Sequence, residues 1–234
     1  MKPSLEQRFY GFIAALVVGG VAKTLFFLDP KTGTLRRRLG SFTTPVNALA
    51  FNPAGTQLAV GCGESMRPYE KQMDGSENSL RIFDLKSRAG RRRNFVAMVE
   101  GLDVSPTGEQ VALAADGNAV ILVEAKSLRQ RRLHGSQLAK ANLGGFAPRA
   151  AHSAVVRGLA YVGARHLASV SGDGKMRSHN ELRVWDHVSG KEVHRVLQLE
   201  HSLRGVVSQG GWVLTRSRLE AHLWNFSSLE AKPR

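Results

Sequence analysis

The stretch that decides the fold is NELRVWDHVSGKEVHRV, residues 180–196. Apolar and polar residues alternate through LRVW and stop at Asp186, and the chain turns through Ser189 and Gly190 before a second alternating run begins. A period of two followed by a Gly-containing turn predicts a β-hairpin. If similar units recur at a regular spacing, the chain is a repeat protein in which each unit buries its apolar face against its neighbours.

Four relatives of this stretch occur elsewhere in the chain. Each is a short apolar run closed by an acidic or amide residue: TLFFLD, SLRIFD, AVILVE and AHLWN. The five closing residues lie at intervals of 55, 40, 62 and 39 residues and are Asp29, Asp84, Glu124, Asp186 and Asn225. Two of these intervals match the length of one four-stranded propeller blade, about 40 to 45 residues.

Another pair of alternating runs, joined by a Gly-containing turn, precedes each of the last four closing residues. The pairs are VNALAFNPAGTQLAVGC, VEGLDVSPTGEQVALAADG, VRGLAYVGARHLASVSGDG and LRGVVSQGGWVLTRSRL. The repeating unit is therefore four strands linked by turns. The two long intervals, of 55 and 62 residues, contain insertions. The first has ESMRPYEKQMDGSEN in the second unit, and the second has GSQLAKANLGGFAPRAAHS and, just before ELRVWD, the short segment KMRSHN. We expect these insertions in loops at the blade ends, where binding residues tend to lie.

The sequence thus predicts an all-β β-propeller of about five four-stranded blades, as one domain over residues 1–234. The units run roughly over residues 9–42, 43–98, 99–150, 151–202 and 203–234. The first unit has little room for a first strand, and the last has no clear fourth strand. Two alternatives remain open: LEQRFYG near the N-terminus supplies the last strand and closes the ring, or the ring is incomplete and a partner or a second copy fills the gap.

This pattern resembles the WD40 family over nearly the whole chain. In the fourth unit the matching residues are His152 before the first strand, Ser171 and Asp173 at the turn after the second strand, and Trp185 at the end of the third. In that family these His, Ser, Asp and Trp side chains form a hydrogen-bond network inside one blade. The resemblance implies this structural role for the four residues, and it implies partner binding through blade-end loops and the rim. The other units match the motif less well.

The charge of the chain favours an anionic partner. Thirty-three Lys and Arg residues against nineteen Asp and Glu residues give a formal net charge of +14. RNA, an acidic protein surface and an anionic membrane are all consistent with this charge. The apolar run at residues 9–22 is short and is followed by Lys23, so we expect two strands there and no membrane span. The single cysteine, Cys62, excludes an internal disulfide and fits an intracellular protein, cytoplasmic or nuclear.

Arginines recur at the same place in three consecutive units. Arg36, Arg91 and Arg131 each stand seven residues after the closing acid of their unit. The clusters around them lie on the predicted outermost strands and contain Arg36, Arg37 and Arg38, then Arg91, Arg92 and Arg93, then Arg129, Arg131 and Arg132. Because successive strand side chains point to opposite faces, three neighbouring blades would carry a cationic belt along the rim.

Two interpretations of this belt remain open. Charges on outer strands prevent edge-to-edge aggregation. Arginine also forms bidentate contacts with carboxylates and phosphates, so the belt is equally a candidate for partner binding. The insertion in the second unit adds Arg67, Tyr69 and Lys71 to the candidate binding residues. If the belt binds nucleic acid, we expect contact with the phosphate backbone alone, because aromatic side chains for base stacking are scarce near it.

No motif in the chain predicts catalysis, a metal site or a cofactor. GGVAKT, residues 19–24, lacks the glycines of a phosphate loop, and the eight histidines do not have the spacing of zinc ligands. Cys62 has no identifiable base for a nucleophilic role. The sequence therefore predicts a noncatalytic scaffold for protein-protein interaction within a larger complex. The alternative is a component associated with RNA that binds phosphates through the same belt.

Overall fold

The computed structural model describes residues 16–40, 42–64, 78–115, 117–134, 151–172, 180–197 and 199–230. These residues form eighteen β-strands and one short helix, α2 (Ser227–Glu230). The strands belong to five separate antiparallel sheets, which we number blades 1 to 5 in chain order. The prediction of an all-β fold is confirmed. Within this part of the chain, no helix has the length and apolar character needed to cross a membrane.

The strands of each blade follow one another along the chain. Blade 1 contains β1 (Leu16–Val18), β2 (Leu25–Leu28) and β3 (Leu35–Leu39). Blade 2 contains β4 (Val46–Phe51), β5 (Gln57–Cys62), β6 (Ser79–Asp84) and β7 (Gly90–Asn94). Blade 3 contains β8 (Gly101–Val104), β9 (Gln110–Ala115), β10 (Ala119–Glu124) and β11 (Gln130–Leu133). Blade 4 contains β12 (Val156–Val162), β13 (His166–Ser171), β14 (Glu181–Asp186) and β15 (Lys191–Val196), and blade 5 contains β16 (Gly205–Gln209), β17 (Trp212–Arg216) and β18 (Ala221–Asn225).

The predicted four-stranded pattern is found in blades 2, 3 and 4. Among the described residues, blade 1 has no counterpart of the innermost strand and blade 5 has none of the outermost strand. Helix α2 follows β18, where a fourth strand of blade 5 would otherwise begin. The segment LEQRFYG, a candidate for a closing strand, lies outside the described residues.

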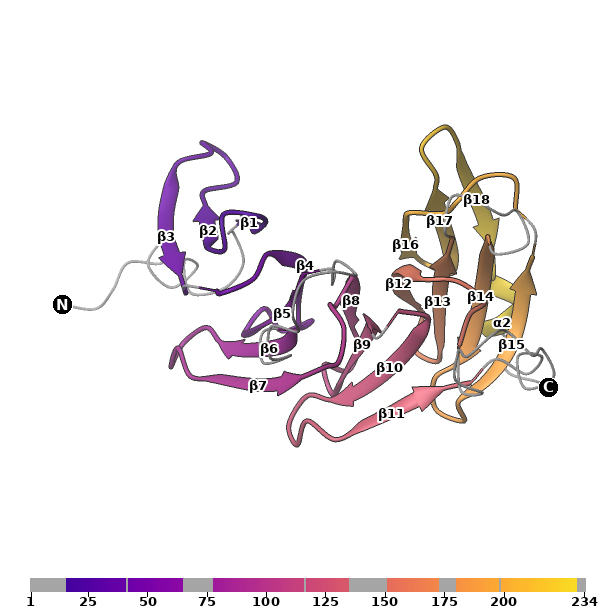
Figure 1. Cartoon of the computed structure of the whole chain (residues 1–234), viewed down its shortest axis with the longest axis horizontal. Coiled ribbons are helices and arrows are strands. Elements are labelled where there is room, and N and C mark those ends of the chain that lie inside the picture. Colours follow the sequence, from indigo (N-terminus) through magenta and orange to yellow (C-terminus); the bar gives the residue numbers. More distant parts are fainter. Residues whose placement is uncertain are drawn as a thin grey trace, which may run out of the picture.

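The blades form an arc around a common axis. The innermost strands β4, β8, β12 and β16 lie side by side in that order. Figure 1 shows blade 1 and blade 5 on opposite sides of a gap, so the described residues form an open ring. The choice between the two sequence-based alternatives depends on LEQRFYG, which lies outside the described residues.

Apolar layers between neighbouring blades form the core. Leu80 and Ile82 of blade 2 pack with Val111 and Leu113 of blade 3, and all four are almost completely buried. Because alternate residues of a strand point to opposite faces, each blade contributes one row of side chains to the layer on either side of it. The core of each blade therefore depends on its neighbours, as expected for a repeat protein.

The closing residues cap the turn that follows the third strand. Oδ1 of Asp84 accepts hydrogen bonds from the backbone N–H groups of Lys86 (3.0 Å) and Ser87 (2.7 Å). The hydrogen bond from Ser87 is the main reason that the pKa of Asp84 lies below its usual range. The same kind of backbone hydrogen bond is accepted by Asp29, Asp186 and Asn225. A short acidic or amide side chain recurs at the repeat interval because it stabilises this turn.

Candidate functional site

A hydrogen-bonded network fills the interior of blade 4. Trp185 Nε1 donates to Ser169 Oγ (2.8 Å), which lies 2.6 Å from His152 Nε2. His152 Nδ1 lies 2.9 Å from Ser171 Oγ and 3.0 Å from Glu181 Oε2. An ionised carboxylate only accepts hydrogen bonds, so we assign the proton of His152 to Nδ1, and Nε2 accepts from Ser169. The network ties the segment before β12 to β13 and β14.

Buried ion pairs extend this network. Arg183 Nε donates to Glu181 Oε2 (2.9 Å), and Arg183 Nη1 donates to Glu192 Oε2 (2.6 Å). Burial alone would raise the pKa of Glu181, but hydrogen bonds from His152 and Arg183 outweigh it and hold the pKa at about 2. Burial lowers the pKa of His152. Each buried charge thus has an opposite partner, which offsets the cost of removing it from water.

The structure brings together three of the four residues that the WD40 resemblance implied for this blade. His152, Ser171 and Trp185 belong to the network, whereas Asp173 lies outside the described residues. The hydroxyl that bridges the histidine to the tryptophan is that of Ser169, two residues before Ser171 on the same face of β13. Sequence reasoning missed this serine, because the resemblance assigned the role to the residue at the end of the strand.

Blade 5 repeats part of the same arrangement. Trp224 Nε1 donates to Thr215 Oγ1 (2.9 Å), which is the counterpart of the Trp-Ser bond in blade 4. Glu220 lies 3.7 Å from His201 Nε2 and 3.2 Å from His222 Nε2. A signal for both networks was present in the sequence. A His-Ser pair stands before the first strand, and a glutamate stands four residues before the tryptophan, in both units.

The arginines of β7 in blade 2 reach the next blade. Arg91 Nη1 donates to the backbone oxygen of Lys126 (2.7 Å), and Arg93 Nη1 donates to that of Leu128 (2.8 Å). Arg93 Nε also donates to Gln130 Oε1 (2.9 Å). All three acceptors lie in or beside the β10–β11 turn of blade 3. These two belt arginines therefore connect neighbouring blades.

Blade 3 connects to blade 4 in the same way. The guanidinium of Arg131 donates to the backbone oxygen atoms of Val188 (3.0 Å) and His187, in the β14–β15 turn. Arg129 instead pairs with Glu124 of its own turn, with Nη2 and Oε1 2.9 Å apart, and its side chain is 79% exposed. Neighbouring arginines of one cluster thus have different surroundings.

Blade 1 departs from the predicted register. A shift in the β2–β3 pairing places Arg37, and not Arg36, opposite Phe27, which packs in the core between blades 1 and 2. The guanidinium of Arg37 lies 5.4 Å from the centre of the Phe27 ring, and that of Arg38 lies 5.6 Å from the centre of the Phe26 ring. Counting seven residues from the closing acid therefore finds the arginine that faces the next blade in blades 2 and 3 but not in blade 1.

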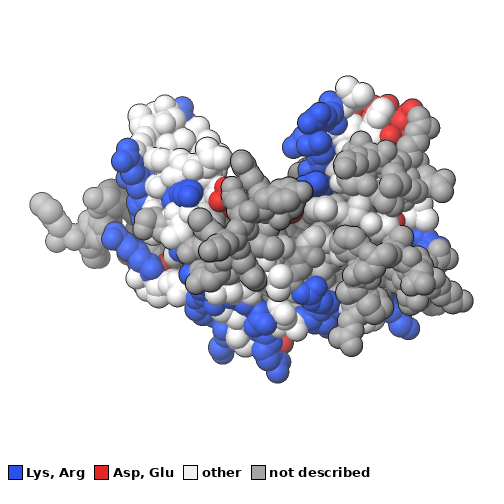
Figure 2. Space-filling model, in the orientation of Figure 1, with Lys and Arg blue, Asp and Glu red and all other residues white. Residues whose placement is uncertain are grey.

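The belt keeps an exposed part. Arg38 and Arg92 are exposed on their outer strands, as is Arg129 on its turn, and Figure 2 shows Lys and Arg side chains along the outer edge of these blades. Arg36 pairs with Asp29 of its own turn, and Arg132 is half-buried. The remaining candidates from the sequence, Arg67, Tyr69 and Lys71, lie outside the described residues.

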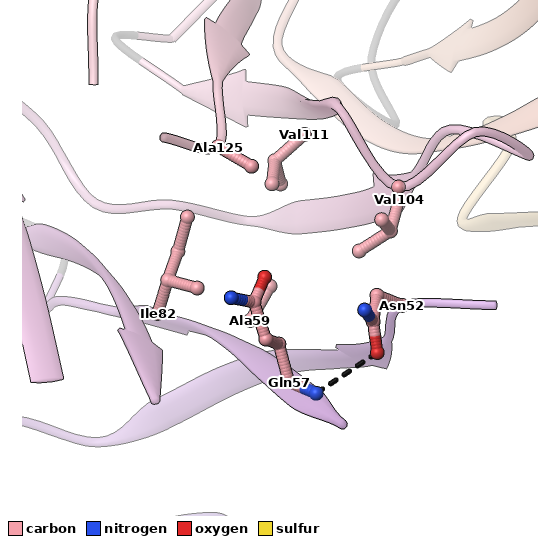
Figure 3. Close-up of a pocket in the computed structure, with 8 residues that line it drawn as sticks. Asn52, Gln57, Ala59, Ile82, Val104, Val111 and Ala125 are labelled. Atoms are coloured by element: carbon pink, nitrogen blue, oxygen red, sulfur yellow. Dashed lines mark hydrogen bonds between the residues drawn. The ribbon is translucent and has the colours of Figure 1, made fainter. Parts of the chain in front are cut away.

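A small cavity lies between blades 2 and 3 (Figure 3). Ile82, Val104 and Val111 line its apolar part, and the backbone N–H of Gln57 donates to Asn52 Oδ1 (2.9 Å) at its polar end. Its volume is about 10 Å³, which is close to the space that one water molecule needs. The cavity is too small to hold a substrate.

A group of acidic and histidine side chains lies on the surface of blade 5. Potential ligand atoms of Glu200, His201 and Glu220 lie within 4.8 Å of one another. The spacing of the histidines in the sequence did not predict this group. His201 and Glu220 are the counterparts of His152 and Glu181 in blade 4, which accounts for their proximity.

Comparison with known proteins identifies the fold. No protein-family model matches the chain, and no curated protein matches it. The solved β-propeller domain of Cps50 (Swd1) from Myceliophteria thermophila is similar, with a TM-score of 0.71 and 18% sequence identity. The fold is that of a β-propeller. The similarity covers 93% of this chain and 64% of that domain, so the chain spans less than two thirds of the length of the domain it matches.

Proposed function

We propose that the chain is a noncatalytic propeller scaffold that binds a protein partner within a larger complex, and that arginines of the rim contact acidic side chains of this partner. The observation that carries the proposal is the set of exposed arginines on adjacent blades, Arg38, Arg92 and Arg129, in a chain of net charge +14. A guanidinium forms bidentate hydrogen bonds with a carboxylate, and a sheet holds such groups at fixed spacings.

The belt divides between two tasks. Arg91, Arg93 and Arg131 donate to backbone groups of the next blade, so their first role is structural. Arg92 points to the opposite side of β7 from its two neighbours, and Arg129 is open to solvent although it pairs with an acid. We assign partner binding to this second group. In the proposal, Arg67, Tyr69 and Lys71 of the blade 2 insertion extend the binding surface.

A charge-removal experiment tests this assignment. R92E/R129Q, expressed with a tag in cells of the source organism, should retain about fivefold less of the protein partner than the unaltered chain. The expected loss is about 1 kcal/mol, because each exposed ion pair contributes up to about 1 kcal/mol. The melting temperature should stay within about 2 °C, because neither residue bonds to a neighbouring blade in the described structure.

A matched control removes the same charge outside the three arginine clusters. K23Q/K191E changes exposed lysines on blades 1 and 4 and should leave the amount of partner unchanged. If both double variants lose the partner equally, net charge alone explains capture and the belt has no special role.

The RNA alternative has its own measurement. Filter binding of a poly(U) oligonucleotide at two salt concentrations should show little affinity if the proposal holds. Two results together would assign the belt to RNA instead. The first is tight binding in which the logarithm of the association constant falls against the logarithm of the salt concentration, with a slope of roughly 0.7 per phosphate contact. The second is weaker binding of the oligonucleotide by R92E/R129Q.

A further inference from the structure

The face of blade 5 that points away from blade 4 is apolar and uncovered. Val207, Leu214 and Leu223 lie opposite one another on β16, β17 and β18, and they are 61%, 42% and 63% exposed. Trp212 lies two residues before Leu214, on the same face, and is 45% exposed. These four large apolar side chains cross all three strands of the sheet.

Residues at the corresponding positions of blade 4 are core residues. Leu182 and Val184 of β14, with Ala168 and Val170 of β13, point toward blade 5 and have no exposed surface. The closing acid aligns the two blades, and Leu223 occupies the position that Val184 occupies in blade 4, two residues before it. The exposed face of blade 5 therefore has the composition of an interface between two blades, although no blade of the described chain covers it.

Blade 1 has an equivalent open face at the other end of the arc. Leu16, Val18 and Leu35 are 53%, 43% and 46% exposed. Strand pairing places Leu28 between Leu16 and Leu35, and it places Phe26 beside Val18. This face is opposite the one that packs against blade 2. Two apolar sheet faces thus border the same gap, and apolar surfaces of this kind mark sites of interaction.

Arginines accompany both open faces. Arg216 lies over Gly205 on the open face of blade 5, and Arg204 and Arg218 are exposed near it. Arg38 lies over Phe26 on the open face of blade 1. Figure 2 shows a hollow between the two blades with Lys and Arg side chains on the wall that blade 5 forms. The gap is therefore apolar at its two sheet faces and positively charged around them.

The size of the gap and its charge together indicate the occupant. The chain spans 64% of a propeller domain to which it is similar with a TM-score of 0.71, so a ring of that size has room for further blades. A β-sheet with alternating apolar residues is the surface that complements these faces, as between the blades of the chain itself. A second copy would bring another net charge of +14 and the same arginines into the gap, and this repulsion opposes self-association.

We propose that a separate acidic protein completes the ring. It contributes antiparallel β-sheet as the additional blades, covers the open faces of blades 1 and 5 at once, and places carboxylates beside Arg38 and Arg216. This inference rests on the proposed scaffold function and adds to it both the docking surface and the class of partner.

Photo-crosslinking from both faces tests the inference. A benzophenone maleimide is attached in turn to V18C, to L214C and, as a control on the exposed β12–β13 turn of blade 4, away from the belt, to A164C. Cys62 is buried and does not compete for the reagent. After irradiation of the labelled full chain in extract of the source organism, mass spectrometry identifies the crosslinked peptides. We expect V18C and L214C to crosslink to one and the same acidic protein, within segments of alternating apolar residues, and A164C not to do so.

A second variant supports the same test. L214E/L223E should lower the recovery of that protein about tenfold or more, because charges would then enter an apolar interface. Its melting temperature should stay unchanged, because both residues are exposed in the chain alone.

Four outcomes would overturn the inference. These are crosslinks between isotopically distinct copies of the chain, crosslinks to a further stretch of the same polypeptide, different proteins at the two faces, and no crosslinks at either face. The rim assignment fails independently, when R92E/R129Q retains the partner. If R92E/R129Q loses the partner but V18C and L214C give no crosslinks, the proposed scaffold function is supported. The proposal that a separate protein completes the ring is then wrong.

Discussion

At the level of single residues, one position in the turn after the third strand requires a left-handed backbone conformation. The fourth residue after the closing acid has a left-handed backbone in four blades, with φ of 69° at Gly33, 64° at Arg88, 60° at Leu128 and 78° at Gly190. Its N–H donates to the backbone oxygen of the closing acid, for example over 2.9 Å from Arg88 to Asp84. Blades 1 and 4 use glycine there, whereas blades 2 and 3 accept a side chain in a conformation that costs about 1–2 kcal/mol.

Replacing Arg88 by glycine should therefore stabilise the protein. R88G relieves the left-handed strain, and the greater freedom of glycine in the unfolded chain offsets part of the gain, so we expect the free energy of unfolding to rise by about 0.5 kcal/mol. Urea unfolding measures the change. The converse variant G190A should lower the free energy of unfolding by about 1 kcal/mol. A clear loss of stability in R88G would contradict this account of the turn.

At the level of the element, blades 2 and 4 fill the same interior positions differently. Glu181 and Arg183 of blade 4 correspond to Ser79 and Arg81 of blade 2. Without a carboxylate at the first position, Arg81 lies 4.8 Å from the centre of the Phe42 ring, and the buried Ser79 Oγ and Arg81 Nε have no hydrogen-bond partner in the described structure. Blade 4 thus has the full polar network and blade 5 has part of it, whereas blade 2 lacks it, so the network is not common to every unit of the repeat.

The network of blade 4 should make stability depend on pH. In the folded state the pKa values of His152 and Glu181 both lie below their ordinary values of 6.5 and 4.5. A lowered pKa means that the unfolded chain binds the proton more readily, so stability decreases as pH falls. The contribution of His152 is complete above about pH 6.5 and declines below it, and that of Glu181 declines from about pH 4.5 toward 2.

We therefore expect the free energy of unfolding to fall between pH 7 and pH 5.5, by at most about 1 kcal/mol from His152 alone. Urea unfolding at the two pH values measures this change. In H152N the free energy of unfolding should fall less between pH 7 and pH 5.5, although this variant should be less stable than the unaltered protein at both pH values. Equal pH dependence in the two proteins would mean that His152 is not the group that titrates.

At the level of the whole molecule, neighbouring blades are fastened at their cores and also at their rims. Apolar layers join the blades inside, and Arg91, Arg93 and Arg131 reach backbone groups of the next blade outside. Because each blade contacts only its neighbours, stability depends strongly on such interfaces. Part of the positive charge on the rim consequently serves folding.

Variants of two adjacent arginines of β7 distinguish rim arginines that hold neighbouring blades together from those that are only exposed on the surface. R93M removes two hydrogen bonds to blade 3 and should lower the free energy of unfolding by about 1–2 kcal/mol. R92M removes an equal charge from an exposed position and should change the free energy of unfolding by less than about 0.5 kcal/mol. Urea unfolding of both variants gives the comparison. Equal losses would show that the hydrogen bonds to blade 3 contribute little.

The sequence by itself determined the local features of this protein. Strand alternation, the turns and the recurring closing acid, as at Asp84 and Asp186, depend on residues close together in the chain, and from them the repeat, the all-β class and the propeller followed. It also identified His152 and Trp185 as members of one network, because the WD40 resemblance placed both in a single unit.

Only the tertiary structure decided which side chains meet and which remain exposed. A register shift in blade 1 exchanges the faces of Arg36 and Arg37, since shifting a strand by one residue turns each side chain to the other side. The same alternating pattern is core at Val184 and exposed surface at Leu223, because burial depends on whether a neighbouring blade is present. A pattern in one segment specifies what that segment is able to bury, and the rest of the assembly determines whether it is buried.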